Sequence, residues 1–197
     1  LEEAIVPMLF SRKFRTFDLS AVRAGRVFAG VLLCLAAMTA PASETGDALA
    51  LPQDAWRLVT DGVMGGVSSG QLNASEIEGR VCQRLQGQVS TANNGGFIQA
   101  AQDIPARLAS GLDAYTGVRV SLRGKAERYN IHLRTSDLWL PWQSFRTEVA
   151  TNDLWQTFEL PFEKFEGYKT RAALRPERLR RIGIVAIGRE FDADVCI

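Results

Sequence analysis

Polar side chains that can bind a ligand alternate with apolar residues in three successive segments of the sequence. They are Arg119, Ser121, Arg123, Asn130, His132, Arg134, Trp142, Ser144 and Arg146. Guanidinium groups bind carboxylates and phosphates through paired hydrogen bonds, and an indole ring stacks on cations or flat apolar surfaces. If the three segments are neighbouring strands, the alternation places these side chains on one exposed face. This face is the candidate binding surface. The alternative is a solvated outer sheet whose polar groups bond to one another or lie under a loop.

Residues suited to catalysis are few. His132 is the only histidine, and the sequence has no cysteine–histidine cluster, glycine-rich phosphate loop before a helix or nucleophile elbow. A glycosidase with paired carboxylates, using Glu148 or Glu159, is the remaining hydrolytic option. The expected hairpin register places Arg146 opposite Glu159, which favours an ion pair over a catalytic acid. We therefore predict no catalytic residues, no metal and no cofactor.

Two glycine-rich segments stand out, Asp61-Gly-Val-Met-Gly-Gly-Val-Ser68 and Asn93-Asn-Gly-Gly-Phe97. Glycine permits positive φ and close backbone approach, so we expect two tight loops that pack against each other at one end of the domain. The positions expected to serve structure or interaction are Asp61, Met64, Gly65, Gly66, Asn94, Gly95 and Gly96. A calcium site at Asp61 is disfavoured because too few acidic residues lie nearby.

These residues must be positioned by strands. From Trp56 onward apolar residues recur with a period of two between Gly, Asn, Asp and Pro residues, and no long amphipathic helix competes. We expect about nine strands, at 69–74, 80–89, 96–104, 118–123, 129–134, 142–149, 155–160, 181–188 and 191–197. Short strands with turns between them and little helix predict an all-β sandwich of two antiparallel sheets.

The N-terminal segment has the features of an export signal. The uncharged apolar run 27–40 follows Arg23 and Arg26 and ends in Ala40-Pro41-Ala42. It is shorter than the roughly 20 residues that a membrane-spanning helix needs. We predict a signal peptide over 1–42 cleaved after Ala42, a linker at 43–55 and one domain at 56–197. The mature chain would then be periplasmic or otherwise exported, without a membrane span. An arginine-rich mitochondrial presequence is the alternative, and the true start, at Leu1 or Met8, stays open.

Composition and cysteine content narrow the class further. The 197-residue chain is 46% hydrophobic and 23% charged, as expected for one globular domain with a short extra segment. Without residues 1–42 its formal net charge is −1, which argues against nucleic-acid binding. Cys82 and Cys196 would remain after cleavage. A disulfide between two strands and two small buried side chains are equal alternatives for them.

An ordered series of motifs resembles one known family. The series comprises Trp56, 61–68, Asn94-Gly-Gly-Phe97, Tyr129-Asn-Ile-His-Leu-Arg134, Pro141-Trp-Gln-Ser-Phe145, Trp155, Leu160-Pro-Phe162, Phe165 and Ile182-Gly183. It is similar to the complex I intermediate-associated protein 30 family over about 56–197. The resemblance implies a galactose-binding-like jelly roll related in shape to carbohydrate-binding modules. For mitochondrial members it implies a non-catalytic role in assembling NADH:ubiquinone oxidoreductase on the matrix side, whereas an export signal would send this chain to the opposite side of a bacterial inner membrane.

Two functions follow as expectations. The first is an exported, non-enzymatic domain that binds a protein partner, in assembling or maintaining a membrane complex. The second is a carbohydrate-binding module of the cell envelope that uses Trp142, His132 and the arginines to hold a glycan or a small acidic ligand.

Overall fold

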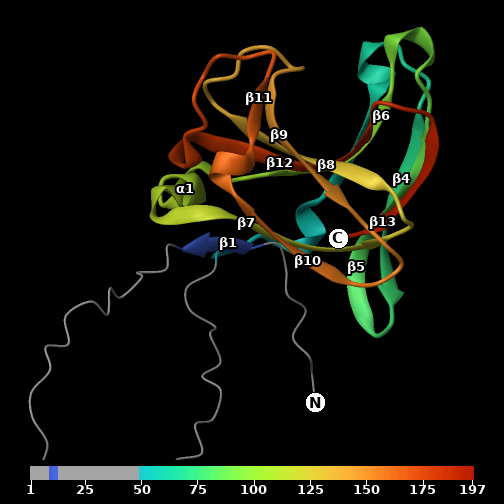
Figure 1. Cartoon of the computed structure of the whole chain (residues 1–197), viewed down its shortest axis with the longest axis horizontal. Coiled ribbons are helices and arrows are strands. Elements are labelled where there is room, and N and C mark those ends of the chain that lie inside the picture. Colours follow the sequence, from blue (N-terminus) through green and yellow to red (C-terminus); the bar gives the residue numbers. More distant parts are fainter. Residues whose placement is uncertain (1–8, 13–48) are drawn as a thin grey trace, which may run out of the picture.

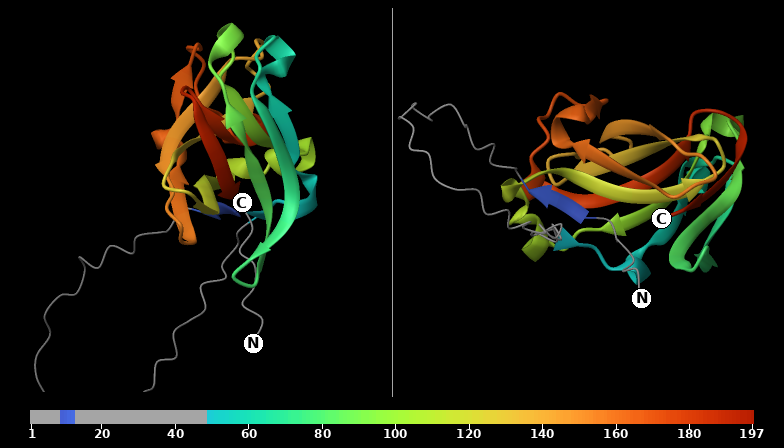
Figure 2. Two further views of the ribbon diagram at one scale, coloured as in Figure 1. Left: turned by 90° about the vertical axis from the view of Figure 1, so that its right-hand side faces the viewer. Right: turned by 60° about the horizontal axis from the view of Figure 1, so that its bottom comes forward.

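Two antiparallel sheets form the part of the chain that the computed structural model describes, residues 9–12 and 49–197 (Figures 1 and 2). The first, the β7 sheet, has the order β2 (Leu49–Ala50), β1 (Leu9–Arg12), β7 (Tyr115–Gly124), β13 (Phe191–Cys196), β5 (Arg80–Val89) and β4 (Ser69–Ile77). Strand β10 (Gln156–Pro161) pairs with the other edge of β7. The second, the β8 sheet, has the order β11 (Glu166–Tyr168), β9 (Ser144–Ala150), β8 (Arg128–Thr135), β12 (Leu179–Ile187), β6 (Phe97–Asp103) and β3 (Arg57–Thr60).

The helical elements in the described part of the chain are short. They are α1 (Ala106–Ala109) and the 3₁₀ turns η1 (Gln53–Ala55), η2 (Asp61–Met64), η3 (Ala92–Asn94), η4 (Leu112–Ala114), η5 (Phe162–Lys164) and η6 (Pro176–Arg178). None of the helices within 9–12 and 49–197 is long and apolar enough to cross a membrane. The predicted all-β jelly-roll sandwich of two antiparallel sheets is confirmed.

The core lies between the two sheets and is built by the predicted alternation. Val118, Val120 and Leu122 of β7 are buried, and so are Tyr129, Ile131 and Leu133 of β8. The polar residues between them therefore point away from the core, because successive side chains of a strand face opposite ways. Burying one such apolar side chain contributes roughly 1.5–3 kcal/mol, so the core fixes which face of each strand is exposed.

Strand β1 comes from the segment predicted to be a leader. It pairs with β7 through Leu9↔Arg119 and Phe10↔Val118, and with the two residues of β2. Phe10 is buried, and its ring lies 6.0 Å from that of Tyr115 in an edge-to-face arrangement. The rest of the predicted leader lies outside the described residues, so its cleavage stays a prediction. Within the predicted linker, Leu51 is also buried in the core.

The cysteine alternatives are resolved in favour of the disulfide. Cys82 of β5 and Cys196 of β13 are bonded, with their Cα atoms 5.5 Å apart. Both side chains are buried. The bond joins two neighbouring strands whose cysteines are 114 residues apart in the sequence.

Candidate binding face

The outer face of the β8 sheet carries most of the predicted binding residues. Because Tyr129, Ile131 and Leu133 face the core, Asn130, His132 and Arg134 face outward on β8. The register brings other residues beside them on the same face: Arg146 opposite His132, Arg181 opposite Arg134, and Asp103 opposite Arg181. Figure 1 shows the β11 end of this sheet rising at the left and the β6 end rising at the right, so the outer face is concave.

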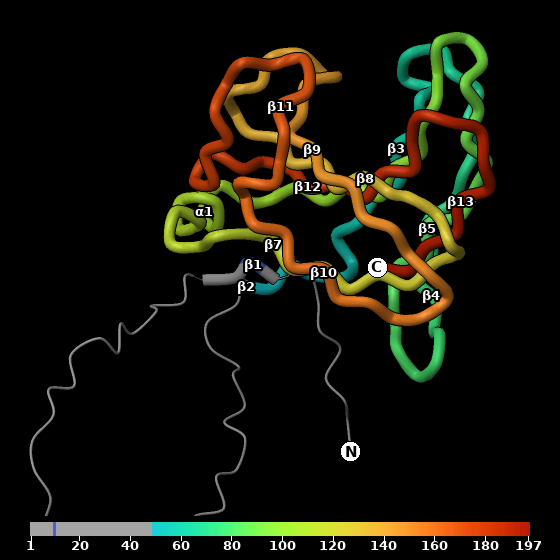
Figure 3. The backbone as a smooth tube through the Cα atoms, in the orientation of Figure 1, coloured from blue at the N-terminus to red at the C-terminus, as the bar shows by residue number. Residues whose placement is uncertain are grey.

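Three predicted neighbours belong elsewhere. Arg119, Ser121 and Arg123 lie on β7, in the other sheet, so the expectation that all three segments are adjacent strands is wrong. The β7–β8 connection and the β9–β10 connection both cross between the sheets, at the same end of the molecule (Figure 3). They bond to each other there, with the Thr151 amide donating to the Glu127 carbonyl at 2.9 Å. A crossover and a hairpin leave the same alternating pattern, which is why the pattern could not separate them.

The β9–β10 crossover also shows that the predicted ion pair between Arg146 and Glu159 is wrong. Strand β10 pairs with β7, so Glu159 lies opposite Arg119 and not Arg146. The Arg119 guanidinium donates to Glu159 at 2.8 Å. On the same outer surface Arg123 forms an ion pair with Glu78, 3.3 Å apart. These arginines are therefore neutralised on the face opposite the candidate binding surface.

His132 lies low on the outer face. Its side chain is 9% exposed, and its Nε2 atom has no hydrogen-bond partner in the described part of the chain. Burial, helped by the neighbouring charge of Arg146, lowers the pKa of His132 to about 3. The imidazole is therefore neutral at physiological pH, and its Nε2 atom is enclosed by the surrounding protein.

Arg146 is held in one orientation by its neighbours. Its Cζ atom lies 3.5 Å from the centroid of the Tyr168 ring, and its Nε donates to Ser144 Oγ at 2.8 Å. Burial lowers the pKa of Arg146, and the Tyr168 hydroxyl partly opposes that fall. The side chain nevertheless stays charged, because guanidinium is protonated throughout the working range of proteins.

The β8–β9 loop, residues 136–143, stands at the rim of this face and presents two indoles. Trp139 is 92% exposed and Trp142 is 47% exposed. Arg134 fixes the loop by donating to the carbonyls of Leu140 and Pro141. Gln143 accepts from the Leu140 amide and donates to the Lys169 carbonyl at 2.9 Å, which ties the loop to the segment after β11. The loop is thus ordered although its aromatic rings are in solvent.

The base of the loop is bound to η6 as well. Asp137 forms ion pairs with Arg175 at 2.8 Å and with Arg178 at 3.1 Å. The Ser136 amide donates to the Arg178 carbonyl at 2.9 Å. These contacts hold the rim in place before any ligand arrives.

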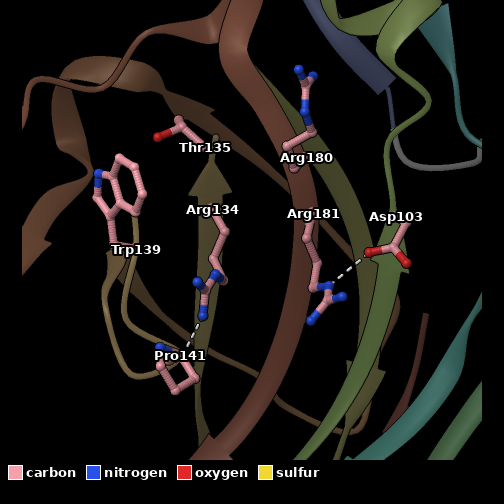
Figure 4. A pocket seen from close by; sticks show the side chains of 7 residues that line it. All are labelled: Asp103, Arg134, Thr135, Trp139, Pro141, Arg180 and Arg181. Atoms are coloured by element: carbon pink, nitrogen blue, oxygen red, sulfur yellow. Dashed lines mark hydrogen bonds and ion pairs between the residues drawn. The ribbon is translucent and has the colours of Figure 1, made fainter. Parts of the chain in front are cut away.

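A pocket of about 370 Å³ lies between this loop and strands β8, β12 and β6. Its lining residues are Asp103, Arg134, Thr135, Trp139, Pro141, Arg180 and Arg181. Figure 4 shows the Trp139 indole at one side, Arg134 directed toward Pro141, and Arg181 directed toward Asp103. The Arg181 Nε atom donates to Asp103 at 2.7 Å, and Asp103 also pairs with Arg57 at 3.0 Å. The pocket therefore combines one aromatic wall with a fixed set of hydrogen-bonding groups.

The glycine-rich loops do pack together, and a buried carboxylate is the reason. Asp61 is fully buried and accepts from Ser68 Oγ at 2.5 Å, from the Ser68 amide at 3.0 Å and from the Gly96 amide at 2.6 Å. A Cβ atom on Gly66 or on Gly95 would lie 2.3 Å or 2.4 Å from the Asp61 carboxylate. Side chains at these two positions would displace it, which explains two of the glycines.

Three other predicted positions in these loops adopt positive φ angles. Gly65 and Gly96 have φ angles of 86° and 131°, which glycine adopts readily, and Asn94 has a φ of 57°. Met64 is 52% exposed. The groups around the Asp61 carboxylate are hydrogen-bond donors, which stabilise its negative charge. A calcium ion would need several oxygen ligands in their place.

Of the seven residues that line the pocket, only Arg134 is among the binding residues that strand alternation predicts. Trp139 lies in a loop, so strand alternation says nothing of it, although two tryptophans within four residues are a usable signal. Asp103 is the last residue of β6 and Arg181 is the third residue of β12, and only the pairing of these two strands brings them together.

The fold defines a class of protein: a galactose-binding-like jelly-roll sandwich of two antiparallel sheets. Within that class, the sequence matches the model of the complex I intermediate-associated protein 30 (CIA30) family over residues 47–195, and the chain belongs to that family. No curated protein sequence matches the chain at a significant level.

Solved structures with this fold include carbohydrate-binding modules. The family 11 module of the cellulosomal cellulase Lic26A-Cel5E of Clostridium thermocellum superposes with a TM-score of 0.56 at 11% identity, covering 72% of this chain and 84% of that one. The family 11 module from Clostridium thermocellum in complex with a β-1,3-1,4-mixed-linked tetrasaccharide superposes with a TM-score of 0.56 at 10% identity, covering 72% and 85% of the two chains. These similarities establish the fold.

Proposed function

We propose that this chain is a non-catalytic binding domain that holds an oligosaccharide against the outer face of the β8 sheet. The observation that carries the proposal is the exposed indole of Trp139 beside a pocket lined by Arg134, Arg181 and Asp103. A sugar ring has an apolar face that stacks on an indole and a rim of hydroxyls that bond to planar charged groups.

The ordered loop at the rim also supports oligosaccharide binding. The Trp139 loop is fixed by Arg134, Gln143 and Asp137 before binding, so little conformational entropy is lost when a ligand stacks on it. A related fold holds a tetrasaccharide in the family 11 module. The ligand class is inferred from this chain's own side chains, because the identity to that module is low.

The proposal includes no reaction. Glu148 and Glu159, the carboxylates considered for a glycosidase, lie on different sheets, and each is paired with an arginine: Glu148 with Arg128 at 3.4 Å and Glu159 with Arg119 at 2.8 Å. A glycosidase needs two carboxylates on either side of one bond, about 5–10 Å apart. These two residues do not meet that requirement.

Glycan binding can be tested with the full chain on a glycan array, followed by calorimetry on the best ligand. Trp139→Ala should weaken binding by about fivefold to a hundredfold or more, since stacking on one aromatic ring contributes about 1–3 kcal/mol. Trp142→Ala is the matched control, because this indole is on the same loop but does not line the pocket. Equal affinity for Trp139→Ala and the parent chain would refute the proposed site.

A protein partner is the second candidate, and a different observation favours it. Leu140 and Trp142 are exposed beside Trp139, and Val63, Met64 and Val67 are exposed on the η2 loop. Exposed apolar side chains grouped on ordered loops often mark protein interfaces. The family name points to an assembly partner of complex I.

The two candidates predict different results for the same variants. A protein interface across the whole loop would lose affinity with Trp139→Ala and with Trp142→Ala, whereas a sugar in the pocket would depend on Trp139 alone. Capture of NADH:ubiquinone oxidoreductase subunits from membranes by the parent chain, lost in both variants, would favour the protein partner.

We also propose that the protein works outside the cytoplasm. The Cys82–Cys196 disulfide supports an oxidising compartment, since such bonds persist in exported proteins. A periplasmic fraction that contains the protein with Ser43 as its first residue would support export and cleavage after Ala42. A mitochondrial location or an intact N-terminus would contradict this part of the proposal.

A further inference from the structure

The binding face carries more positive than negative side chains. Arg134, Arg146 and Arg181 all point from this face, and Asp103 is shared between Arg181 and Arg57. Arg134 lies opposite Arg181 in the strand register, and burial together with that neighbouring charge lowers its pKa. Positive groups thus outnumber negative ones where a ligand would lie, and such a surface attracts anions.

Arg146 is the most informative of these residues because it has no carboxylate partner within residues 9–12 and 49–197. Glu166 lies opposite it in the β11–β9 register, but it is exposed and forms no ion pair with Arg146 in that part of the chain. Stacking on Tyr168 and the bond to Ser144 occupy one face and the Nε–H of the guanidinium. The Tyr168 hydroxyl also hydrogen-bonds the guanidinium, and the terminal N–H groups that it does not use are available to a ligand carboxylate.

Arg146 lies where an unpaired positive charge is unfavourable. The side chain is only partly accessible, and charges taken from water are normally paired. His132, directly opposite on β8, is nine-tenths buried and leaves Nε2 without a partner in the described structure. A ligand carboxylate at the accessible part of Arg146 would offset the charge of that side chain, with the buried His132 imidazole lying beside it as a neutral neighbour.

We propose that Arg146, with His132 beside it, binds a carboxylate of the ligand, so that the saccharide bound by this domain carries uronic-acid units. The inference rests on the proposed function and narrows it to acidic glycans. It also separates this face from one that takes a neutral glucan, because a neutral sugar would leave the Arg146 charge without a counter-ion.

Calorimetry with the full chain tests this with a matched pair of ligands. Oligogalacturonate carries free carboxylates, and its fully methyl-esterified form has the same backbone without charge. Oligomers of mannuronate and glucuronate, with neutral β-glucan oligomers as the comparison, extend the test to other backbones. We expect at least one acidic oligomer to bind about tenfold to a hundredfold more tightly than its esterified form, which is the range for a hydrogen-bonded ion pair.

Arg146→Gln should abolish that preference while leaving weak binding of the esterified ligand. Arg119→Gln is the control, since Arg119 is a strand arginine on the opposite sheet and its loss should change neither ligand. The preference should also fall as salt is raised, because the interaction is between charges.

The outcomes separate this inference from the proposed function. If neutral glycans bind and depend on Trp139 while acidic ones bind no better, the acidic preference is wrong and the glycan function stands. Acidic binding that is equal in Arg146→Gln and the parent chain would also overturn the role of Arg146. If no glycan of either kind binds, the proposed function fails and this inference fails with it.

Discussion

Replacing the buried Asp61 by asparagine tests how the two glycine-rich loops are held together. The substitution keeps the shape of the side chain and removes its charge. In the parent chain, Oδ2 accepts from Ser68 Oγ at 2.5 Å, from the Gly96 amide at 2.6 Å and from the Phe97 amide at 3.3 Å. The other oxygen, Oδ1, accepts from the Ser68 amide at 3.0 Å.

An amide at this position can keep only one of the two oxygen positions as an acceptor. In its better orientation it retains the three bonds at Oδ2, places its NH₂ group against the Ser68 amide, and weakens the remaining bonds by loss of charge. Hydrogen bonds to charged groups contribute about 1.5–3 kcal/mol each, so we expect Asp61→Asn to lower the free energy of unfolding by about 3 kcal/mol. For a domain of this size this corresponds to a fall in Tm of about 6–12 °C.

Urea unfolding at pH 7, followed by tryptophan fluorescence, measures the change. Asp153→Asn is the control, because Asp153 is exposed in the β9–β10 connection. Gly66→Ala and Gly95→Ala should be destabilising as well, since their new Cβ atoms would collide with the Asp61 carboxylate. Equal transition midpoints for Asp61→Asn and the parent chain would refute the view that this carboxylate holds the loops.

The pH dependence gives an independent check on the sign. Burial pushes the pKa of Asp61 up, but the hydrogen bonds from Ser68, Gly96 and Phe97 outweigh it and hold the pKa below the ordinary value of 3.8. A carboxyl group whose pKa is lower in the folded state stabilises the fold above its unfolded pKa, and this stability is lost as pH falls through the folded pKa. The difference between the parent chain and Asp61→Asn should therefore be largest near neutral pH and shrink below about pH 4.

Three further predictions concern the disulfide, strand β1 and His132. Replacing Cys82 and Cys196 by serine opens a loop of 114 residues, which should lower the free energy of unfolding by about 4–5 kcal/mol in the chain-entropy model; equal urea midpoints with and without reductant would contradict this. Phe10→Ala in the purified full chain should cost about 3–5 kcal/mol, because a buried ring leaves a cavity; an unchanged midpoint would mean that β1 does not contribute its packing to the fold. Because the pKa of the folded His132 imidazole is lowered to about 3, its NMR chemical shifts should stay constant from about pH 5 to 8. The free energy of unfolding should fall as the pH drops below about 6.5, since the unfolded chain then binds a proton at His132 and the folded chain does not. His132→Gln should remove that part of the pH dependence.

The local sequence pattern is sufficient to predict which face of each strand is buried. Val118, Val120 and Leu122 face the core as their alternation predicts, and so do Tyr129 and Leu133. Period-two alternation reports the burial of one face directly, since a one-residue slip would expose every apolar side chain of the strand. The glycine-rich segments likewise predict two loops that pack together. The role of the Asp61 carboxylate in holding them is visible only from its hydrogen bonds to Ser68 and Gly96.

Pairing between strands is where the pattern fails. The alternation predicts Arg119 on the same face as Arg134, yet its strand is in the other sheet, and Glu159 pairs with Arg119 instead of Arg146. Nothing in residues 124–128 or 150–156 distinguishes a tight hairpin from a crossover, because both need polar residues and a change of direction. Asp103 and Arg181 could not be joined from sequence for the same reason.

Local alternation and motif order are enough to predict an all-β sandwich, the outward direction of His132, Arg134 and Arg146, and the family of the chain. Three features depend instead on contacts between distant segments: which strands share a sheet, the bond between Cys82 and Cys196, and the position of Trp139 beside Arg134 and Arg181 at the pocket. Those contacts join residues far apart in the chain, and their geometry follows from the way the two sheets close around a common core, which no single segment specifies.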